Sequence, residues 1–290
     1  MQKHSLYGLV AGLTAASIWG GMYVVSKVVM GTIPPFTLIT LRLLLGIAVL
    51  YIIVWRRGGL TPPRILFWQV LRVGFIGYGI SLGFQFVGTK LSTAANGSLV
   101  TSATPTFVLL FAALILRERI TARRLLALAI ASLGVVAVID PRTAQLEPDL
   151  FWGNISLVMA AITWALYSVL IRKVTREVDV LTTSLIAFMG GLIVSVPLSG
   201  YELFRGGAGP ITPGIIAGIL FLGIISTALA MFLWNTAFAE LPAGVASLTF
   251  FAQPVVGTIL GVIFLGDKIT PLFLLGGVLI GIGILISAKD

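Results

Sequence analysis

Residues 91–134 read LSTAANGSLVTSATPTFVLLFAALILRERITARRLLALAIASLG, an apolar stretch interrupted by Pro105, then a charged turn and a second apolar stretch. The pattern returns at residues 240–283 as ELPAGVASLTFFAQPVVGTILGVIFLGDKITPLFLLGGVLIGIG. With a shift of 149 positions, the residues of the first copy that meet identical ones are Ala94, Ser98, Leu99, Ala103, Pro105, Leu116, Ile120, Thr121, Leu125, Leu126 and Gly134. Self-similarity at a fixed shift indicates an internal repeat, so the chain is predicted to be a duplicated unit.

The composition predicts an all-α integral membrane protein. Hydrophobic residues make up 58% of the chain and charged residues only 10%, with a mean hydropathy of +1.09, whereas soluble domains carry about 25% charged residues. The net charge of +9 could otherwise suggest nucleic acid as a partner. The basic residues lie in short loops between apolar runs, where they orient helices in a bilayer, so lipid is the expected partner and nucleic acid is not.

Apolar runs near the roughly 20 residues that cross a hydrocarbon core recur along the chain. They are Leu6–Met30, Phe36–Trp55, Trp68–Gly88, Thr93–Leu116, Arg123–Ile139, Trp152–Ile171, Val180–Ser199, Pro213–Trp234, Ala243–Leu265 and Pro271–Ala288. The first is longer than the roughly 7 to 15 apolar residues of a signal peptide, and with a shift of 145 its Trp19 meets Trp164. We therefore expect ten transmembrane helices in two repeats of five, at residues 6–140 and 151–288.

An odd number of spans in each repeat means that the second copy enters the membrane from the opposite side, so the repeats are predicted to be inverted. If both termini are cytoplasmic, the inner segments hold Lys3, Arg56, Arg57, Arg64, Arg72, Arg117, Arg119, Arg123, Arg124, Arg172, Lys173, Arg176 and Lys289. The outer loops then hold only Lys90, Arg142, Arg205 and Lys268. This bias follows the positive-inside rule and predicts a multi-pass protein of the cell (plasma) membrane with cytoplasmic termini.

Two prolines mark a break in the repeated helix. Pro105 cannot donate a hydrogen bond to the carbonyl of Thr101, and Pro254 cannot donate to that of Phe250. Freed carbonyls are costly in lipid and should face protein or a wet cavity. Inverted repeats with interrupted helices are typical of secondary transporters, whose sites lie between the repeats; a plain structural kink is the alternative.

Polar and aromatic residues recur on matching faces of the two copies. Tyr78, Ser81, Gln85 and Thr89 share one helical face, and a similar stripe with Thr101 and Thr104 precedes Pro105. Polar groups at this depth should face the bundle interior or water, which predicts a central small-molecule cavity. Interhelical hydrogen bonding, at about 0.6 to 2 kcal/mol per group, is the alternative.

The predicted substrate-binding set combines that cavity with Arg42, an ionisable residue at depth that could attract a substrate carboxylate. Lys27 is nearer a helix end, where neutralisation or snorkelling explains it. The set is Trp19, Tyr23, Arg42, Tyr78, Gln85, Asn96, Thr101, Trp164, Tyr167, Trp234, Asn235, Phe250 and Gln253.

The residues also argue against enzymatic chemistry. The chain has no cysteine and a single histidine, His4, and no Asp, Glu or His lies inside a predicted span. A metal cluster or a nucleophilic dyad therefore cannot be assembled at depth, and the phosphate-binding loop pattern is missing. We expect no catalytic residues, no metal, no cofactor and no enzyme activity.

Four segments resemble the EamA domain of the drug/metabolite transporter superfamily: Trp19-Gly20-Gly21, Arg42 after Pro34-Pro35, Pro105-Thr106-Phe107 leading to Arg117-Glu118-Arg119-Ile120-Thr121, and Gln253-Pro254 leading to Gly266-Asp267-Lys268-Ile269-Thr270. The resemblance covers essentially the whole chain as two domains. It implies ten helices in inverted repeats, cytoplasmic termini, a central cavity and export of metabolites such as amino acids, aromatic ones included. The second copy departs from it at Gly266-Asp267, where many members have Gly-Glu, and at Phe250-Phe251.

The predicted function is a secondary transporter that moves small metabolites, amino acids with aromatic or other apolar side chains, out of the cell by alternating access. One alternative is a sugar-phosphate or nucleotide-sugar exchanger, which would need several Lys or Arg at mid-depth, and another is a membrane scaffold without transport. The glycines of the last span (Gly276, Gly277, Gly281, Gly283) fit close helix packing. That packing could be internal or between copies, which leaves a monomer or a homodimer open.

Overall fold

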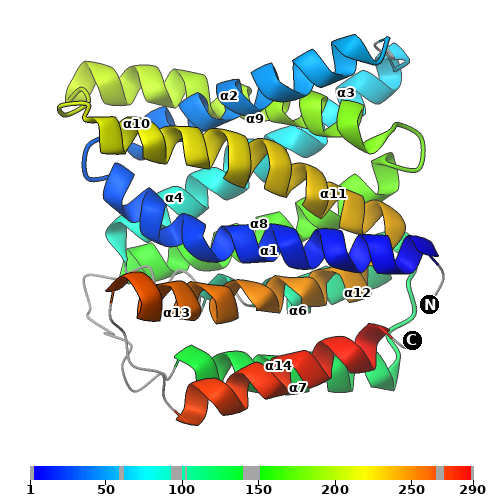
Figure 1. The fold of residues 1–290 in the computed structure, drawn as a ribbon. Coiled ribbons are helices and arrows are strands. Elements are labelled where there is room, and N and C mark those ends of the chain that lie inside the picture. The colour runs from blue at the N-terminus through cyan, green and yellow to red at the C-terminus, as the bar shows by residue number, and fades with distance from the viewer. Residues whose placement is uncertain are drawn as a thin grey trace.

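Helices form all of the regular secondary structure in the described residues. The computed structural model describes residues 3–58, 62–92, 100–101, 103–139, 151–265 and 271–288. Over these ranges the regular secondary structure is helical and contains no strand, which confirms the predicted all-α class. Figure 1 shows the helices side by side in one bundle, with the N- and C-terminal ends of the chain at the same end of it.

The first half begins with two long helices, α1 (Lys3–Val29) and α2 (Pro35–Arg56). The next rod consists of α3 (Arg64–Gly74), the π-helical η1 (Phe75–Ser81) and α4 (Leu82–Leu91). It is followed by α6 (Thr104–Phe111) with the π-helical η2 (Ala112–Leu116), and then by α7 (Ala122–Ile139).

The second half repeats this order. It consists of α8 (Phe151–Val174), α9 (Val180–Arg205), the rod of α10 (Pro213–Leu220), η5 (Phe221–Leu229) and α11 (Ala230–Glu240), the rod of α12 (Ala243–Leu248), η6 (Thr249–Phe251) and α13 (Ala252–Leu265), and finally α14 (Pro271–Ala288). The π-helical segments η1 and η5 occupy corresponding rods of the two halves. A local irregularity is therefore repeated together with the sequence.

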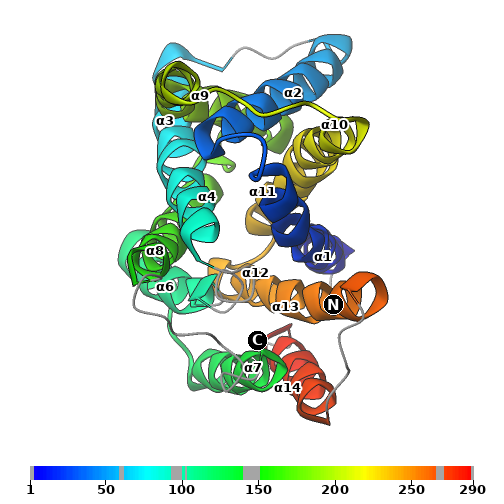
Figure 2. The same cartoon turned by 90° about the vertical axis from the view of Figure 1, so that its left-hand side faces the viewer.

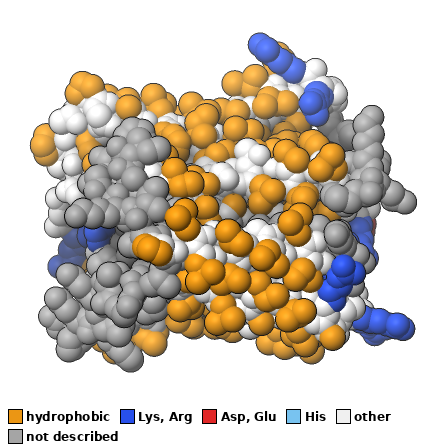
Figure 3. All heavy atoms as spheres, turned by 60° about the horizontal axis from the view of Figure 1, so that its bottom comes forward, with side chains coloured by type: hydrophobic (Ala, Val, Ile, Leu, Met, Phe, Trp, Pro, Cys, Tyr) orange, Lys and Arg blue, Asp and Glu red, His pale blue; other side chains and the backbone are white. Residues whose placement is uncertain are grey.

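Six helical rods of the described chain are long and apolar enough to cross a membrane. They are Leu6–Val29, Pro35–Arg56, Arg64–Leu91, Trp152–Val174, Val180–Arg205 and Pro213–Glu240. Shorter apolar helices cover Thr104–Leu116, Ala243–Gly257 and Leu274–Gly283. In Figure 3 hydrophobic side chains cover the middle of the displayed face, and Lys and Arg lie toward its ends. An apolar exterior of this kind suits contact with lipid, and the chain is a multi-pass membrane protein.

Both prolines of the repeated helix are buried in protein. Pro105 stands in the first turn of α6, where a missing N–H costs little. Pro254 is the third residue of α13 and follows the 3₁₀ turn η6. All three residues of this turn are buried, and at the start of α13 a Cβ at Gly20 of α1 would lie 2.8 Å from the carbonyl oxygen of Gln253. The irregular backbone therefore faces protein rather than lipid.

Helices α7 and α14 pack against each other and form a separate pair beside the rest of the bundle (Figure 2). A Cβ at Gly134 would lie 2.7 Å from the carbonyl oxygen of Gly276, and one at Gly283 would lie 2.8 Å from that of Ala127. These glycines thus serve internal packing. A Cβ at Gly277 or Gly281 would meet no atom within 4 Å, so these two glycines are not needed for packing within the described chain. The prediction of a monomer or a homodimer stays open.

Candidate functional site

A narrow cavity lies between the two halves of the bundle; about 20 Å³ is open to the centres of water-sized molecules, and about 380 Å³ is free of atoms when the open solvent at its mouth is counted. The helices that surround it lie around the middle of the view in Figure 2. Its lining residues are Trp19, Met22, Ser81, Leu82, Gln85, Thr101, Thr104, Ala160, Ala161, Trp164, Met231, Phe250 and Gln253. Six residues of the predicted substrate-binding set are among them: Trp19, Gln85, Thr101, Trp164, Phe250 and Gln253.

Aromatic rings form one wall of the cavity. The ring centroids of Trp19 and Trp164 are 5.7 Å apart and nearly perpendicular, at 80°. Trp234 lies behind them, 5.3 Å from Trp19 and 5.5 Å from Phe250, and its side chain is completely buried. Edge-to-face and tilted contacts at these distances are favourable. The wall is therefore a preorganised apolar surface, and Trp234 supports it without lining the cavity.

A second group of predicted residues ties helices together beside the cavity. The Tyr23 hydroxyl lies 3.0 Å from Thr101 Oγ1, and Gln85 donates from Nε2 to the same hydroxyl at 2.8 Å. This triad joins α1 and α4 to residue 101, which precedes α6. Gln85 and Thr101 reach the cavity, whereas Tyr23 holds them in place from behind.

Tyr78, Tyr167 and Asn235 form a fully buried network that does not line the cavity. The two tyrosine hydroxyls are 2.5 Å apart, and Tyr167 donates to Asn235 Oδ1 at 2.7 Å. Asn235 in turn donates from Nδ2 to Ser184 Oγ at 2.9 Å. Satisfied buried networks rigidify and specify a core. These residues were predicted to contact substrate, and in this structure they contact one another.

Arg42 is also completely buried and lies behind the lining. Its Nε donates to Thr227 Oγ1 at 2.7 Å and its Nη2 to Ser226 Oγ at 3.3 Å. The guanidinium carbon is 5.1 Å from the Phe86 ring centroid, and Nη1 is 3.7 Å from Sδ of the lining residue Met22. Its partners in the described chain are neutral. Asn96, the remaining member of the predicted set, falls outside the described residues.

The sequence interpretation left out several lining residues. Ser81 and Thr104 belong to the polar stripes, and this pattern was enough to include them in the predicted substrate-binding set. Ala160 and Ala161 match Ala15 and Ala16 of the first copy with the shift of 145, but small apolar residues carry no sign of a cavity. The remaining lining residues missed by the prediction are Met22, Leu82 and Met231, which look like ordinary core residues in sequence.

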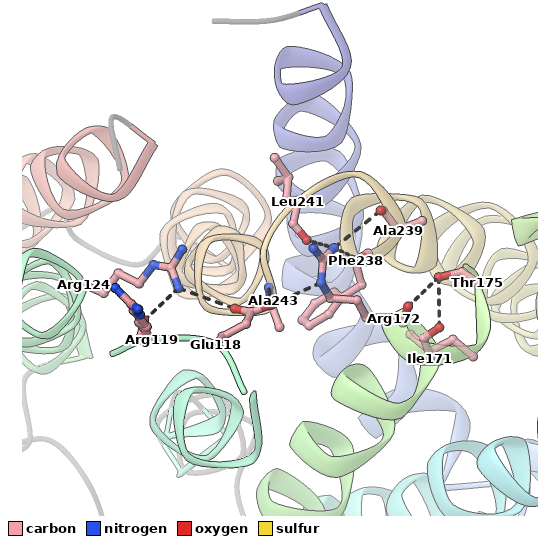
Figure 4. A network of polar contacts seen from close by, with 10 residues as sticks. All are labelled: Glu118, Arg119, Arg124, Ile171, Arg172, Thr175, Phe238, Ala239, Leu241 and Ala243. Carbon is pink, nitrogen blue, oxygen red and sulfur yellow. Dashed lines mark hydrogen bonds and ion pairs between the residues drawn. The ribbon is translucent and has the colours of Figure 1, made fainter. Parts of the chain in front are cut away.

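A network of charged and polar contacts joins several helices at one end of the bundle (Figure 4). Arg172 of α8 donates from Nη1 to the carbonyl oxygens of Phe238 at 2.7 Å, of Ala239 at 3.4 Å and of Leu241. These carbonyls belong to the end of α11 and the turn that follows it. A cation is favourable there because the carbonyls of a last helical turn have no intrahelical donor.

Glu118 holds three partners at the same place. It accepts from Arg172 Nε at 3.2 Å and from the Ala243 backbone N–H at 3.0 Å, both through Oε1. Its Oε2 lies 3.5 Å from Arg124 Nη1. Ala243 is the first residue of α12, so the carboxylate caps that helix. Glu118 thereby joins the segment before α7 to α8 and α12.

Lys27 makes the corresponding contact in the first copy. Its Nζ donates to the carbonyl oxygens of Thr89 at 3.0 Å, Lys90 at 3.2 Å and Ser92 at 2.6 Å, at the end of α4. With the shift of 145 Lys27 corresponds to Arg172, and with the shift of 149 its acceptors correspond to Phe238, Ala239 and Leu241. The two copies therefore use the same cation-to-carbonyl cap.

The two caps lie at opposite ends of the bundle, as the packing of α1 shows. A Cβ at Gly8, near the start of α1, would lie 2.8 Å from Leu241 Cγ. Lys27, near the other end of α1, contacts Ser92. Nineteen helical residues span about 29 Å. Gly153 is the counterpart of Gly8, and a Cβ at Gly153 would lie 3.1 Å from Ser92 Cβ. Because Ser92 is the counterpart of Leu241, this contact is repeated as well.

Comparison with known proteins agrees with the fold. The family model described as "EamA-like transporter family" matches residues 6–139 and 151–288. An uncharacterized transporter of Archaeoglobus fulgidus is 26% identical over 278 residues, 94% of each chain. A "probable amino-acid metabolite efflux pump" of Salmonella typhimurium is 25% identical over 291 residues, covering 95% of this chain and 92% of the relative. A solved crystal structure, 22% identical, matches with a TM-score of 0.79 over 96% of this chain and 95% of that chain.

Proposed function

Because the chain belongs to the EamA-like transporter family, we propose that it exports small, partly apolar metabolites, namely amino acids with aromatic or other apolar side chains. The family and the relatives described above are transporters, so this chain is a membrane transporter and not an enzyme. The observation that carries the proposal is the cavity between the two halves, with its aromatic wall and a few polar groups. Such a lining suits a solute with one apolar and one polar end.

The proposal includes ten membrane-crossing helices in two inverted repeats, with both termini in the cytoplasm. The paired caps support this arrangement, because Lys27 and Arg172 make equivalent contacts at opposite ends of the bundle. Equivalent contacts at opposite ends are what two oppositely inserted copies produce. The short apolar helices α6, α12 with α13, and α14 would complete the set of crossings together with α7.

Alternating access follows from the same symmetry. In this structure the Glu118 network joins α8, α11 and α12 at one end, and the buried Tyr78, Tyr167 and Asn235 network lies deeper in the bundle. Opening that end requires α8 and α12 to separate, which breaks the contacts of Glu118. We propose that the solute leaves or enters by alternately breaking the contacts at the two ends.

The sugar-phosphate or nucleotide-sugar alternative is less well supported. Of the described residues that line the cavity, none is Lys or Arg, and Arg42 lies behind Met22. Phosphate groups call for several cationic or bidentate donors in direct contact. A membrane scaffold without transport differs from the proposed transporter in one measurable property: it would move no solute across the membrane.

The test is uptake of labelled L-phenylalanine by proteoliposomes. We expect the wild-type protein to raise uptake over empty liposomes, and Ala161→Phe, which adds a ring inside the cavity lining, to abolish the increase. Ala129→Phe is the matched control, because Ala129 is exposed on α7 and the added ring has room there. Monodisperse elution in detergent shows that each variant folds. Wild-type protein that moves no tested amino acid would sink the proposal in favour of a scaffold.

A further inference from the structure

We infer that Trp164, Gln253 and Thr104 form the subsite that binds the carboxylate of the transported solute, an inference that rests on the proposed function. All three line the cavity. Each residue is more than nine-tenths buried, with exposed fractions of 7%, 2% and 1% respectively. They come from both halves of the chain, on α8, α13 and α6.

One buried side-chain polar atom in each of these three residues has no partner in the part of the chain that the structure describes. Trp164 Nε1, Gln253 Nε2 and Thr104 Oγ1 are buried and have no hydrogen-bond partner among the described residues. A buried donor without a partner destabilises the folded state because it has lost its hydrogen bonds to water, and such groups in native structures call for an explanation. Ser26 and Ser195 also have a buried hydroxyl without a partner, but neither residue lines the cavity.

Neighbours of the same residue types are satisfied by the protein. Trp19 donates from Nε1 to the Ser226 carbonyl oxygen at 3.0 Å, and Trp234 donates from Nε1 to Ser168 Oγ at 3.1 Å. Gln85 donates from Nε2 to the Tyr23 hydroxyl at 2.8 Å. The Gln253 amide also lies near the Tyr23 hydroxyl, but its Nε2 makes no hydrogen bond of normal geometry there, and an NH₂ group has two N–H donors. Donors left for a ligand are therefore a feature of Trp164 and Gln253, and are not a general property of tryptophans and glutamines in this bundle.

The chemistry of these groups indicates what they bind. An indole N–H only donates, an amide NH₂ donates twice, and a threonine hydroxyl can donate once. A ligand that satisfies all three must bring several acceptors to one place. A carboxylate has two oxygens with about four lone-pair sites and no donor, and hydrogen bonds to its charged oxygens are stronger than those to neutral acceptors.

Arg42 supplies the favourable charge. Its side chain is completely buried, its partners in the described chain are neutral, and it lies against the lining residue Met22. A buried cation acts over several ångströms because the surrounding medium screens it weakly. Of the described lining residues none is Asp or Glu, so a substrate ammonium group meets no counter-charge. Recognition should depend on the carboxylate much more than on the amino group.

Competition against labelled L-phenylalanine in proteoliposomes tests this directly. 3-Phenylpropanoate lacks the amino group and 2-phenylethylamine lacks the carboxylate. We expect 3-phenylpropanoate to compete at least about 10-fold better than the amine, since the amine forfeits two or three hydrogen bonds to a charged group and each such bond corresponds to about tenfold or more. Equal competition by the two analogues would overturn the inference.

Matched variants locate the preference within the cavity. Trp164→Phe removes the unpaired N–H and keeps a ring, and Gln253→Met removes the amide and keeps the length. Each should lower the acid-to-amine preference by about 5-fold or more, in line with one lost hydrogen bond to a charged group. Trp234→Phe is the control for the ratio, because its N–H is already bonded to Ser168. An equal fall in Trp234→Phe and Trp164→Phe contradicts the subsite.

Thermal denaturation of the purified protein in detergent separates this inference from the proposed function, because it needs no transport. We expect 3-phenylpropanoate to raise the Tm of the wild type and of Trp234→Phe, and not that of Trp164→Phe. Stabilisation without any flux would retain the subsite and remove the transport proposal. Flux of amino acids with no stabilisation by the acid and no preference for it would mean that water alone satisfies these donors, and would remove the subsite.

Discussion

The two ends of the bundle carry the same cap with different consequences. Lys27 binds the last carbonyls of α4, and Arg172 binds the corresponding carbonyls of α11. Among the described residues, only the Arg172 end adds a carboxylate to the cap, that of Glu118. Asp267 matches Glu118 in sequence but falls outside the described residues. The repeat thus supplies the cap, and tertiary contact decides how firmly an end is held.

The side chains explain part of this difference. An ammonium group is a compact charge, whereas a guanidinium presents five donors in a planar fork. Arg172 can therefore hold the end of α11 with Nη1 and Glu118 with Nε at the same time. Within the described structure, Lys27 donates its three hydrogen bonds to backbone carbonyls. With arginine at the repeated position, α12 is linked to the cap through Glu118. Lysine at the same position of the first copy binds only the carbonyls at the end of α4.

The largest loss of stability is expected from Glu118→Gln. The change removes the negative charge between Arg172 and Arg124, whose side chains are only 15% and 11% exposed. Breaking a buried pair costs about 3–5 kcal/mol, and we expect about 2–3 kcal/mol here because water reaches the site. The Tm in detergent should fall clearly. Glu202→Gln is the control, since Glu202 caps α2 through Phe36 and Thr37 and its loss should cost only about 1 kcal/mol.

The same substitution should open the Arg172 end. The chain has no cysteine, so a single reporter can be introduced without background, and Ala246 of α12 is completely buried. We expect Glu118→Gln to raise the rate at which a maleimide labels the Ala246→Cys reporter by about 5-fold or more, as expected for a shift of about 1 kcal/mol in the opening equilibrium. Glu202→Gln should leave the rate unchanged. An equal rise in both would show general loosening instead of a specific contact.

A smaller effect is expected when the two ends are made alike. Arg172→Lys keeps a cation for the carbonyls, as Lys27 does, and loses the bond from Nε to Glu118. We expect a loss of about 1–2 kcal/mol, close to one hydrogen bond to a charged group. Lys27→Arg, the reciprocal change, should alter stability by less than about 0.5 kcal/mol, typical of a surface charge. A larger loss in Lys27→Arg than in Arg172→Lys would contradict the comparison.

The smallest effect concerns the matched glycines Gly8 and Gly153. A Cβ at Gly8 would lie 2.8 Å from Leu241 Cγ, and a Cβ at Gly153 would lie 3.1 Å from Ser92 Cβ. Alanine gains about 1 kcal/mol over glycine within a helix, and overpacking costs about 1–3 kcal/mol. Gly8→Ala should therefore lower the Tm slightly, whereas Gly153→Ala should be nearly neutral. Gly200→Ala, where a Cβ meets no atom within 4 Å, should be neutral or stabilising.

Six of the thirteen residues that line the cavity could be predicted from the repeated stripes. Trp19 and Trp164, Thr101 and Phe250, and Gln85 were singled out because polar or aromatic residues recurred at matching positions at membrane depth. Tyr78, Trp234 and Asn235 carried the same signal, and yet they lie one layer behind the lining. Helical periodicity indicates which face is interior but not how far each side chain reaches, because that distance depends on the neighbouring helix.

The sequence by itself determined the membrane class, the duplication, the interior faces and the family, because burial in lipid demands long apolar helices and a repeat leaves identical residues at a fixed shift. Tertiary structure alone decided which donors are already paired. Both Trp164 and Trp234 are tryptophans at membrane depth, but of their two indole N–H groups only that of Trp234 has an acceptor among the described residues, the Ser168 hydroxyl. Hydrogen bonds depend on separations of a few tenths of an ångström between segments far apart in the chain, and composition and periodicity do not specify such distances.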